Sequence, residues 1–271
     1  MCGVVRYRAF IMKSSILWVL CVIGVVYMGL CVYLFAMQRS LIYFPVGADR
    51  DVPADDLRIP SGGESLQVWN LSPGQPKALI YFGGNAENVS QNLPAFAEFF
   101  PDYSLYLVNY RGYAQSTGSP TEDALYADAL SVYEHVRRKH TDVAVIGRSL
   151  GSGVATYLAA QRPVERLALV TPFDSLVNVA QSAYPFMPVS LFLRDRYDSL
   201  GRAPSIAAPT LILMAARDRI IPARRSEALV AGFAPAQVVV KVIDDADHNT
   251  IGQFADYGKA LSGFFQGPHG T

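Results

Sequence analysis

Short apolar runs alternate with helical patterns from about residue 77 onward, and this alternation limits the fold more than any other feature. Most of the runs are continuously apolar, which is typical of strands buried on both faces of a parallel sheet. The predicted strands are Lys77–Phe82, Ser104–Tyr110, Asp142–Ile146, Arg166–Val170, Leu211–Ala215 and Val238–Ile243. The helical patterns lie near Asn92–Phe100, Thr121–His140, Leu150–Gln161, Ala223–Phe233 and Phe254–Phe265. Such alternation predicts βαβ units and therefore an α/β fold with a mostly parallel, doubly wound sheet.

Two details complete the predicted domain, which covers residues 39–271 without an internal boundary. Leu57–Pro60 and Glu64–Leu71 are expected to add antiparallel strands at one edge of the sheet. Ser119-Pro120-Thr121-Glu122 is expected to form a capping box at the start of the second helix. Because ligands of open α/β sheets bind beyond the carboxyl ends of the strands, catalytic residues are expected directly after strands.

The motif Gly147-Arg148-Ser149-Leu150-Gly151 matches G-x-S-x-G and stands between a predicted strand and a predicted helix. This is the setting of a nucleophile elbow, in which a strained turn exposes the serine and glycines leave room for it. Ser149 is therefore the candidate nucleophile, and the Leu150 N–H would point to a developing oxyanion. A dinucleotide-binding loop fits less well, since Thr156 stands where G-x-G-x-x-G needs its third glycine.

A histidine that serves such a serine comes last in the chain, after the acid. His248 and His269 are the two histidines that follow Ser149. His248 comes shortly after a predicted strand, whereas His269 lies in a Gly/Pro tail. His135 and His140 belong to a charged helical stretch, where a solvated face is expected. His248 is therefore the candidate general base.

Asp218 follows the strand Leu211–Ala215 closely and is the candidate acid that orients His248. Asp174, just past the preceding strand, is the alternative. The acidic residues before the base are expected to form a solvated loop rather than a metal site. They are Asp244, Asp245 and Asp247.

The loop Gly83-Gly84-Asn85-Ala86-Glu87-Asn88 directly follows the strand Lys77–Phe82. Glycines there let a backbone N–H approach the substrate oxygen, which predicts that Asn85 N–H completes the oxyanion hole with Leu150. Ala86 is the alternative donor, and Gly84 is expected to contact substrate. A simple strand-to-loop turn is the structural alternative for this loop.

With these motifs the chain closely resembles the α/β-hydrolase superfamily. In particular it resembles a branch anchored by a single membrane helix, related to serine aminopeptidases and acyl-protein thioesterases. The resemblance runs from about Gln38 to Phe265 and implies an α/β-hydrolase fold and serine-hydrolase chemistry. The matching segments are QRSLIYFP, FGGNAEN, NYRGYAQSTGSPTE, GRSLGSG, TPFDSL, ARDRIIP and DHNTI. The family usually carries His-Gly-Asn where this chain has Gly83-Gly84-Asn85, and Arg111 matches a position that we interpret as structural.

An uncharged run of twenty-two residues, Ile16–Met37, precedes this domain. At about 1.5 Å per residue, a helix of this length spans the roughly 30 Å hydrocarbon core of a bilayer. We therefore predict a transmembrane helix over residues 15–38 after a short tail, residues 1–14. A cleaved secretory signal is the alternative, but the run is long for one and lacks an A-x-A-like cleavage site.

The charges that flank this run predict its orientation. Arg6, Arg8 and Lys13 precede it, whereas Arg39 and Arg50 follow it, and the positive-inside rule favours a cytoplasmic N-terminus with the catalytic domain on the far side. In a eukaryotic lumen, Asn88-Val89-Ser90 would be a glycosylation acceptor beside the predicted catalytic loop, where a glycan would obstruct, so a bacterial periplasm is favoured. Met12 is a second candidate start, and a chain beginning there would keep only Lys13 of the three.

Composition excludes several other functions. The 23 basic and 23 acidic residues balance, so no electrostatic footprint for nucleic acid is present. All three cysteines lie within the first 31 residues, which leaves the domain without a disulfide framework or a cysteine-based zinc site. Neither a metal nor another cofactor is expected, and the oligomeric state is not predicted.

The stretch 175–208 lies between two predicted strands, where this fold inserts a cap. It is rich in apolar residues that could line an acyl pocket or simply cover the sheet, and Tyr184 and Phe186 are expected to bind substrate. The predicted protein is a membrane-anchored serine hydrolase of esters or thioesters, with amides as a further option and a small, acylated or lipid-like substrate. The alternatives are a serine aminopeptidase-like peptidase and a catalytically idle fold used for interaction.

Overall fold

The computed structural model describes residues 2–47, 49 and 51–267, with side chains from Ser15 onward. The chain forms two compact units that divide after Leu41. The first unit is a single helix, α1 (Cys2–Ile42). Its backbone is helical already within the predicted tail and continues past residue 38, since no proline interrupts the chain before Pro45.

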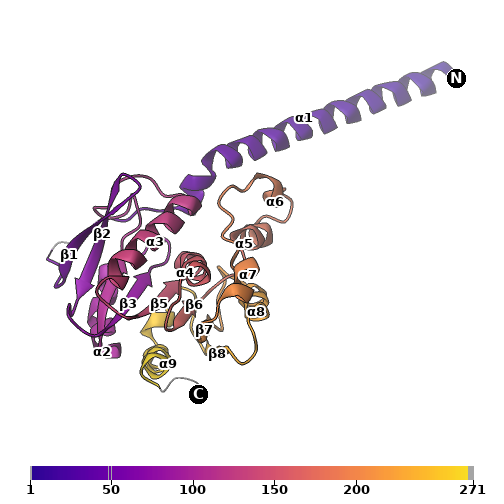
Figure 1. The fold of residues 1–271 in the computed structure, drawn as a ribbon. Coiled ribbons are helices and arrows are strands. Elements are labelled where there is room, and N and C mark those ends of the chain that lie inside the picture. The colour runs from indigo at the N-terminus through magenta and orange to yellow at the C-terminus, as the bar shows by residue number, and fades with distance from the viewer. Residues whose placement is uncertain (1, 48, 50, 268–271) are drawn as a thin grey trace. The chain divides into compact units, whose positions relative to one another are not determined.

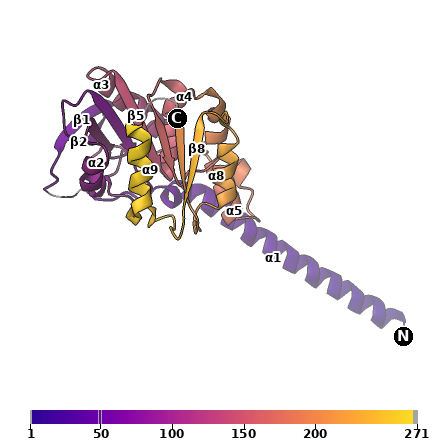
Figure 2. The same ribbon diagram turned by 90° about the horizontal axis from the view of Figure 1, so that it is seen from below.

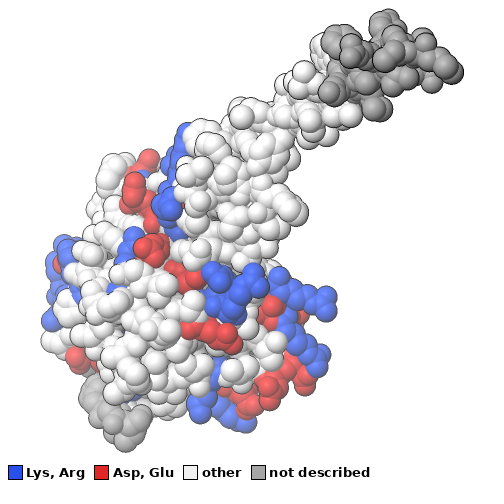
Figure 3. All heavy atoms as spheres, turned by 90° about the vertical axis from the view of Figure 1, so that its right-hand side faces the viewer, with Lys and Arg blue, Asp and Glu red and all other residues white. Residues whose placement is uncertain are grey.

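The part of α1 from Ser15 to Ile42 contains an 18-residue stretch with a mean hydropathy of 2.5, and it is long and apolar enough to cross a membrane. Its described side chains carry no charge before Arg39, whereas acidic and basic side chains are interspersed on the second unit (Figure 3). A signal sequence would meet the same criteria of length and hydropathy.

The second unit is built on one eight-stranded sheet with the strand order β1-β2-β4-β3-β5-β6-β7-β8 (Figure 1). β2 pairs antiparallel with β1 and β4, and the other neighbours are parallel. The predicted α/β class, the mostly parallel sheet and its antiparallel edge are thus confirmed. The strands are β1 (Asp55–Ser61), β2 (Glu64–Leu71), β3 (Lys77–Phe82), β4 (Tyr103–Val108), β5 (Asp142–Arg148), β6 (Leu167–Val170), β7 (Thr210–Ala215) and β8 (Val238–Ile243).

Helices cover both faces of this sheet (Figures 1 and 2). α3 (Glu122–Arg137), α4 (Leu150–Gln161) and α8 (Ala223–Val230) supply one apolar core, and α2 (Leu93–Phe99) and α9 (Ala255–Gln266) supply the other. The strands alternate between these cores, because successive side chains point to opposite faces. In β3, for example, Ile80 and Phe82 lie in the first core and Leu79 and Tyr81 in the second.

The remaining short helices lie in three places. The segment between β6 and β7, where the cap is predicted, forms α5 (Leu176–Ala183), α6 (Val189–Phe192), α7 (Ser199–Arg202) and the 3₁₀ helix η2 (Ala203–Ser205). The other 3₁₀ helices are η1 (Val89–Asn92), before α2, and η3 (Ile251–Gln253), before α9.

Two local expectations differ from the structure. The apolar run of β8 suggests burial on both faces, but β8 is an edge strand, and Val239 and Val242 are 41% and 53% exposed. The N-cap of α3 is Thr121, whose hydroxyl accepts from Ala124 N, rather than Ser119 in a capping box. With Thr121 as the N-cap, Glu122 is the first residue of the helix rather than the third, as a capping box requires. Its carboxylate instead accepts from the backbone N–H groups of residues 196 and 197.

Candidate active site

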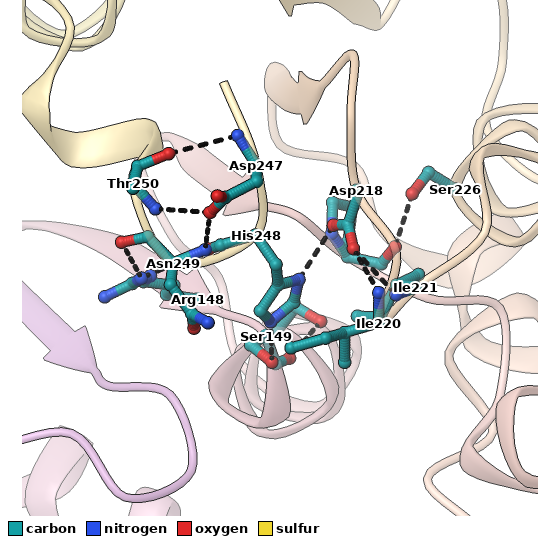
Figure 4. A network of polar contacts seen from close by, with 12 residues as sticks. Arg148, Ser149, Asp218, Ile220, Ile221, Ser226, Asp247, His248, Asn249 and Thr250 are labelled. Carbon is teal, nitrogen blue, oxygen red and sulfur yellow. Dashed lines mark hydrogen bonds and ion pairs between the residues drawn. The ribbon is translucent and has the colours of Figure 1, made fainter. Parts of the chain in front are cut away.

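The three predicted catalytic side chains converge at the carboxyl edge of the sheet (Figure 4). Ser149 follows β5, Asp218 follows β7 and His248 follows β8. Ser149 Oγ lies 2.8 Å from His248 Nε2, and His248 Nδ1 lies 2.7 Å from Asp218 Oδ2. A continuous chain of hydrogen bonds therefore links the hydroxyl, the imidazole and the carboxylate.

The backbone of Ser149 is strained, with φ 50° and ψ −116°, a conformation that non-glycine residues rarely adopt. The flanking glycines permit this turn by allowing close approach. A Cβ on Gly147 would lie 2.4 Å from the Gly151 carbonyl oxygen, and one on Gly151 would lie 2.1 Å from the Phe82 carbonyl oxygen. The turn thus projects the serine hydroxyl while α4 packs tightly against the end of β3.

The Asp218 carboxylate is fixed on both oxygens. Oδ1 accepts from Ile220 N and Ile221 N at 2.9 and 2.8 Å, and Oδ2 accepts from His248. The side chains of Asp218 and His248 are only 7% and 8% exposed. Because the carboxylate accepts, Nδ1 carries the imidazole proton, which leaves Nε2 to accept from Ser149.

The acidic loop before His248 has a structural function that the sequence did not indicate. Asp247 Oδ1 accepts from Asn249 N and Thr250 N, and these backbone donors lower the pKa of Asp247. Arg217 N donates to Ala246 O at 2.9 Å, which ties this loop to the one that carries Asp218. No cluster of three or more His, Cys, Asp or Glu residues that could hold a metal occurs among the described residues.

Asp174, the alternative acid, does not contact His248. It is 1% exposed, and its carboxylate accepts from Asn178 Nδ2 at 2.8 Å and pairs with Arg225 Nη1 at 3.0 Å. Asp174 therefore braces the start of α5 against α8. The other histidine that follows Ser149, His269, lies outside the described residues.

The predicted oxyanion loop lies beside the nucleophile. A Cβ on Gly84 would lie 3.6 Å from the Cβ of Ser149. Within the described part of the chain, neither Asn85 N–H nor Leu150 N–H donates a hydrogen bond, so both are available to a ligand. The Ala86 N–H donates to Asn85 Oδ1 at 3.0 Å, which disfavours it as the donor to substrate.

The other predicted positions are less tightly placed. Tyr184 and Phe186 are 56% and 87% exposed on the cap segment, and their contact with substrate stays a prediction.

Arg111 donates from Nε to Asp128 Oδ2 at 2.7 Å and thereby ties the loop after β4 to α3, as expected of a structural residue.

Sequence reasoning missed an ion pair beneath the site, between Glu87 Oε2 and Arg148 Nη1 at 3.2 Å. Glu87 Oε2 also accepts from Gly84 N at 2.5 Å, and Arg148 Nη2 donates to His248 O at 3.2 Å. Burial lowers the pKa of Arg148, but Glu87 and neighbouring tyrosines raise it by more, to above its ordinary value. The pair thus connects the oxyanion loop, the nucleophile turn and the histidine loop. The signal in the sequence was that the predicted oxyanion loop and the G-x-S-x-G motif each contain one charged residue.

Glu87→Gln is expected to lower kcat about 10- to 100-fold with little change in KM, since small displacements of reacting groups are costly. The carboxamide keeps the shape of the side chain but leaves Arg148 without its counter-charge. Steady-state kinetics on a p-nitrophenyl ester measures the change. Asp256→Asn, which breaks an ion pair with both side chains 75% exposed, is the control. Equal kinetics in the two variants would contradict this function of Glu87.

Comparison with known proteins identifies the family of the chain. Residues 101–254 match the alpha/beta hydrolase domain family, and the chain belongs to that family. It is 34% identical to the Mycobacterium tuberculosis protein Rv2307c over 248 residues, 85% of this chain and 87% of that protein.

Two further proteins are similar to this chain, one in sequence and one in fold. The Macaca fascicularis lysophosphatidylserine lipase ABHD12 is 31% identical over 156 residues, 50% of this chain and 39% of that protein. The Pyrococcus furiosus esterase Pf2001 has the same fold, with a TM-score of 0.67 at 18% identity over 83% of this chain and 98% of that one.

Proposed function

We propose that this protein is a membrane-anchored serine hydrolase that cleaves carboxylic esters or thioesters through an acyl-enzyme. The observation that carries the proposal is the hydrogen-bonded chain from Ser149 through His248 to Asp218. Membership of the alpha/beta hydrolase family, which includes a lipase, supports the same chemistry.

In the proposed reaction, His248 Nε2 takes the hydroxyl proton as Ser149 Oγ attacks the acyl carbonyl carbon. Asp218 stabilises the imidazolium, and the N–H groups of Asn85 and Leu150 donate to the oxyanion. The intermediate collapses as His248 returns the proton to the departing alcohol or thiol. A water, deprotonated by His248, then attacks the acyl-enzyme and releases the acid and free Ser149.

Labelling by a fluorophosphonate tests this chemistry directly, because the probe reacts with an activated serine. Labelling of the native protein that disappears in Ser149→Ala is the expected result. An idle hydrolase fold used for interaction would take no label under any condition. A peptidase would be labelled too, and it would be distinguished by faster turnover of aminoacyl p-nitroanilides than of esters.

A lipid-like acyl ester is the substrate class that we propose. The candidate membrane span of α1 ends at Ile42, and the second unit begins at that residue, so the catalytic unit directly follows the helix in the chain. The cap segment also exposes apolar side chains that long acyl chains could contact, among them Leu191, which is 78% exposed. We place this unit on the extracytoplasmic side, as the basic residues before the helix favour.

Turnover of p-nitrophenyl esters is expected to rise with acyl length from acetyl to octanoyl. Each buried methylene contributes about 0.8 kcal/mol, so kcat/KM is expected to increase at least tenfold over the series. The measurement is kcat/KM below the critical micelle concentration of each ester. A preference for acetyl or butyryl would contradict a lipid-like substrate while leaving serine-hydrolase chemistry intact.

A further inference from the structure

The Asn85 side chain holds the last residue of α1 and the backbone that directly follows it. Its Nδ2 donates to the Ile42 carbonyl oxygen at 2.6 Å, and its Oδ1 accepts from the Phe44 N–H at 2.9 Å. A carboxamide carries its donor and its acceptor on separate atoms, so one side chain can donate to a carbonyl and accept from an N–H of two neighbouring peptides. The segment 42–44 is therefore bound to the oxyanion loop by a matched pair of hydrogen bonds.

A tyrosine hydroxyl completes this clamp. Tyr113 donates from its hydroxyl to Asn85 Oδ1 at 2.8 Å, and the same hydroxyl accepts from Phe44 N at 3.0 Å. Tyr113 is 2% exposed, and burial raises the pKa of its hydroxyl to about 12, although the Phe44 N–H lowers it. The hydroxyl consequently stays protonated and able to donate throughout the pH range in which a serine hydrolase works.

Tyr43 holds the same segment from the other side. Its side chain is 4% exposed, and its hydroxyl lies 3.1 Å from Asp195 Oδ2 and 2.9 Å from the Tyr197 hydroxyl. Both partners follow the cap helices α5 and α6. The segment 42–44 is therefore fixed between the part of the cap that follows α6 and the oxyanion loop.

We propose that residues 42–44 are part of the active-site framework, and that the Asn85 carboxamide is the positioning group through which they orient the oxyanion loop. The inference rests on the proposed function. Asn85 supplies both the clamped side chain and the N–H assigned to the oxyanion, so holding one orients the other. The next residue, Ala86, has φ +56°, and its N–H donates to the same Oδ1, which stabilises a turn that would otherwise be unfavourable.

The test uses the full-length protein in detergent and compares Asn85→Asp and Tyr43→Phe with the native chain. Asn85→Asp removes the donor to Ile42, and Tyr43→Phe removes a hydroxyl that holds the segment without reaching the nucleophile. Tyr133→Phe is the matched control, since it also removes one tyrosine hydroxyl bond, the one to Pro163 O, at a distant site. Tyr113→Phe is the second clamp variant if Asn85→Asp does not fold.

The readouts are kcat and KM on a p-nitrophenyl ester and the inhibition constant of an alkyl trifluoromethyl ketone. This ketone forms a tetrahedral adduct with an activated serine and places its oxygen in the oxyanion hole. Both clamp variants are expected to lose about 10- to 100-fold in kcat, with KM within threefold. The loss in kcat should not exceed the loss that follows removal of one oxyanion-hole donor. The ketone is expected to bind more weakly in proportion to kcat, and Tyr133→Phe is expected to match the native protein.

The outcomes separate this inference from the proposed function. Folded clamp variants with native kcat and native ketone affinity would overturn the inference. A loss confined to KM, or an equal loss in Tyr133→Phe, would overturn it as well, because either indicates general structural damage. If the native protein takes no fluorophosphonate label and hydrolyses no ester, the proposed function itself fails.

Discussion

Ser149→Ala is expected to lower kcat on ester substrates by about 10⁴- to 10⁶-fold, since the residues of a catalytic triad act as a unit. The substitution removes the nucleophilic oxygen and leaves His248 without the proton that it is positioned to accept. Alanine retains the Cβ, so the strained backbone at φ 50° persists and the measured loss reports the hydroxyl alone. Initial rates at saturating p-nitrophenyl ester, divided by the concentration of folded protein, give the ratio.

Ser205→Ala is the control for this substitution, because Ser205 is an exposed serine on η2 whose hydroxyl donates to Arg202 O. It is expected to retain native turnover and native labelling. A Ser149→Ala variant that keeps more than about one tenth of native kcat would exclude Ser149 as the nucleophile, given the expected loss of several orders of magnitude.

The fold and the candidate triad were predictable because both depend on patterns that are local in the chain. The length and apolarity of the short runs indicate the strands, and the glycines around Ser149 indicate a tight turn. Chain order leaves two histidines, of which His248 comes shortly after a predicted strand. The convergence of Ser149, Asp218 and His248 follows from these once the strands are parallel, because their carboxyl ends then meet at one edge.

The features that could not be predicted depend on partners distant in the chain. Glu87 lies in a loop whose glycines predict backbone donors to a substrate oxygen, but its carboxylate pairs with Arg148, 61 residues later, and no local pattern specifies that pairing. The Asn85 side chain binds backbone at Ile42 and Phe44, which no spacing rule connects with the loop. The exposure of β8 likewise depends on strand order, since the same apolar run would suit a central strand.

Asp218→Asn is expected to lower kcat by about 10⁴-fold, the loss that this change causes in the triad of a serine protease. The asparagine amide can donate to Nδ1 and so favours the imidazole tautomer that has its proton on Nε2. That tautomer cannot take the proton of Ser149. Folding is expected to be little affected, because the amide oxygen still accepts from Ile220 N and Ile221 N. Single-turnover kinetics with a p-nitrophenyl ester measures the acylation step in which the loss should occur.

Asp174→Asn is the matched comparison, since it makes the same change at the other acid that follows a strand. It leaves Arg225 without the carboxylate 3.0 Å away. Breaking a buried pair costs about 3–5 kcal/mol, and the cost is smaller here because the Arg225 side chain is 21% exposed. Urea unfolding should therefore show lower stability, whereas the folded fraction keeps native kcat. A reversed result, with turnover lost in folded Asp174→Asn and retained in Asp218→Asn, would show that Asp218 is not the acid that orients His248.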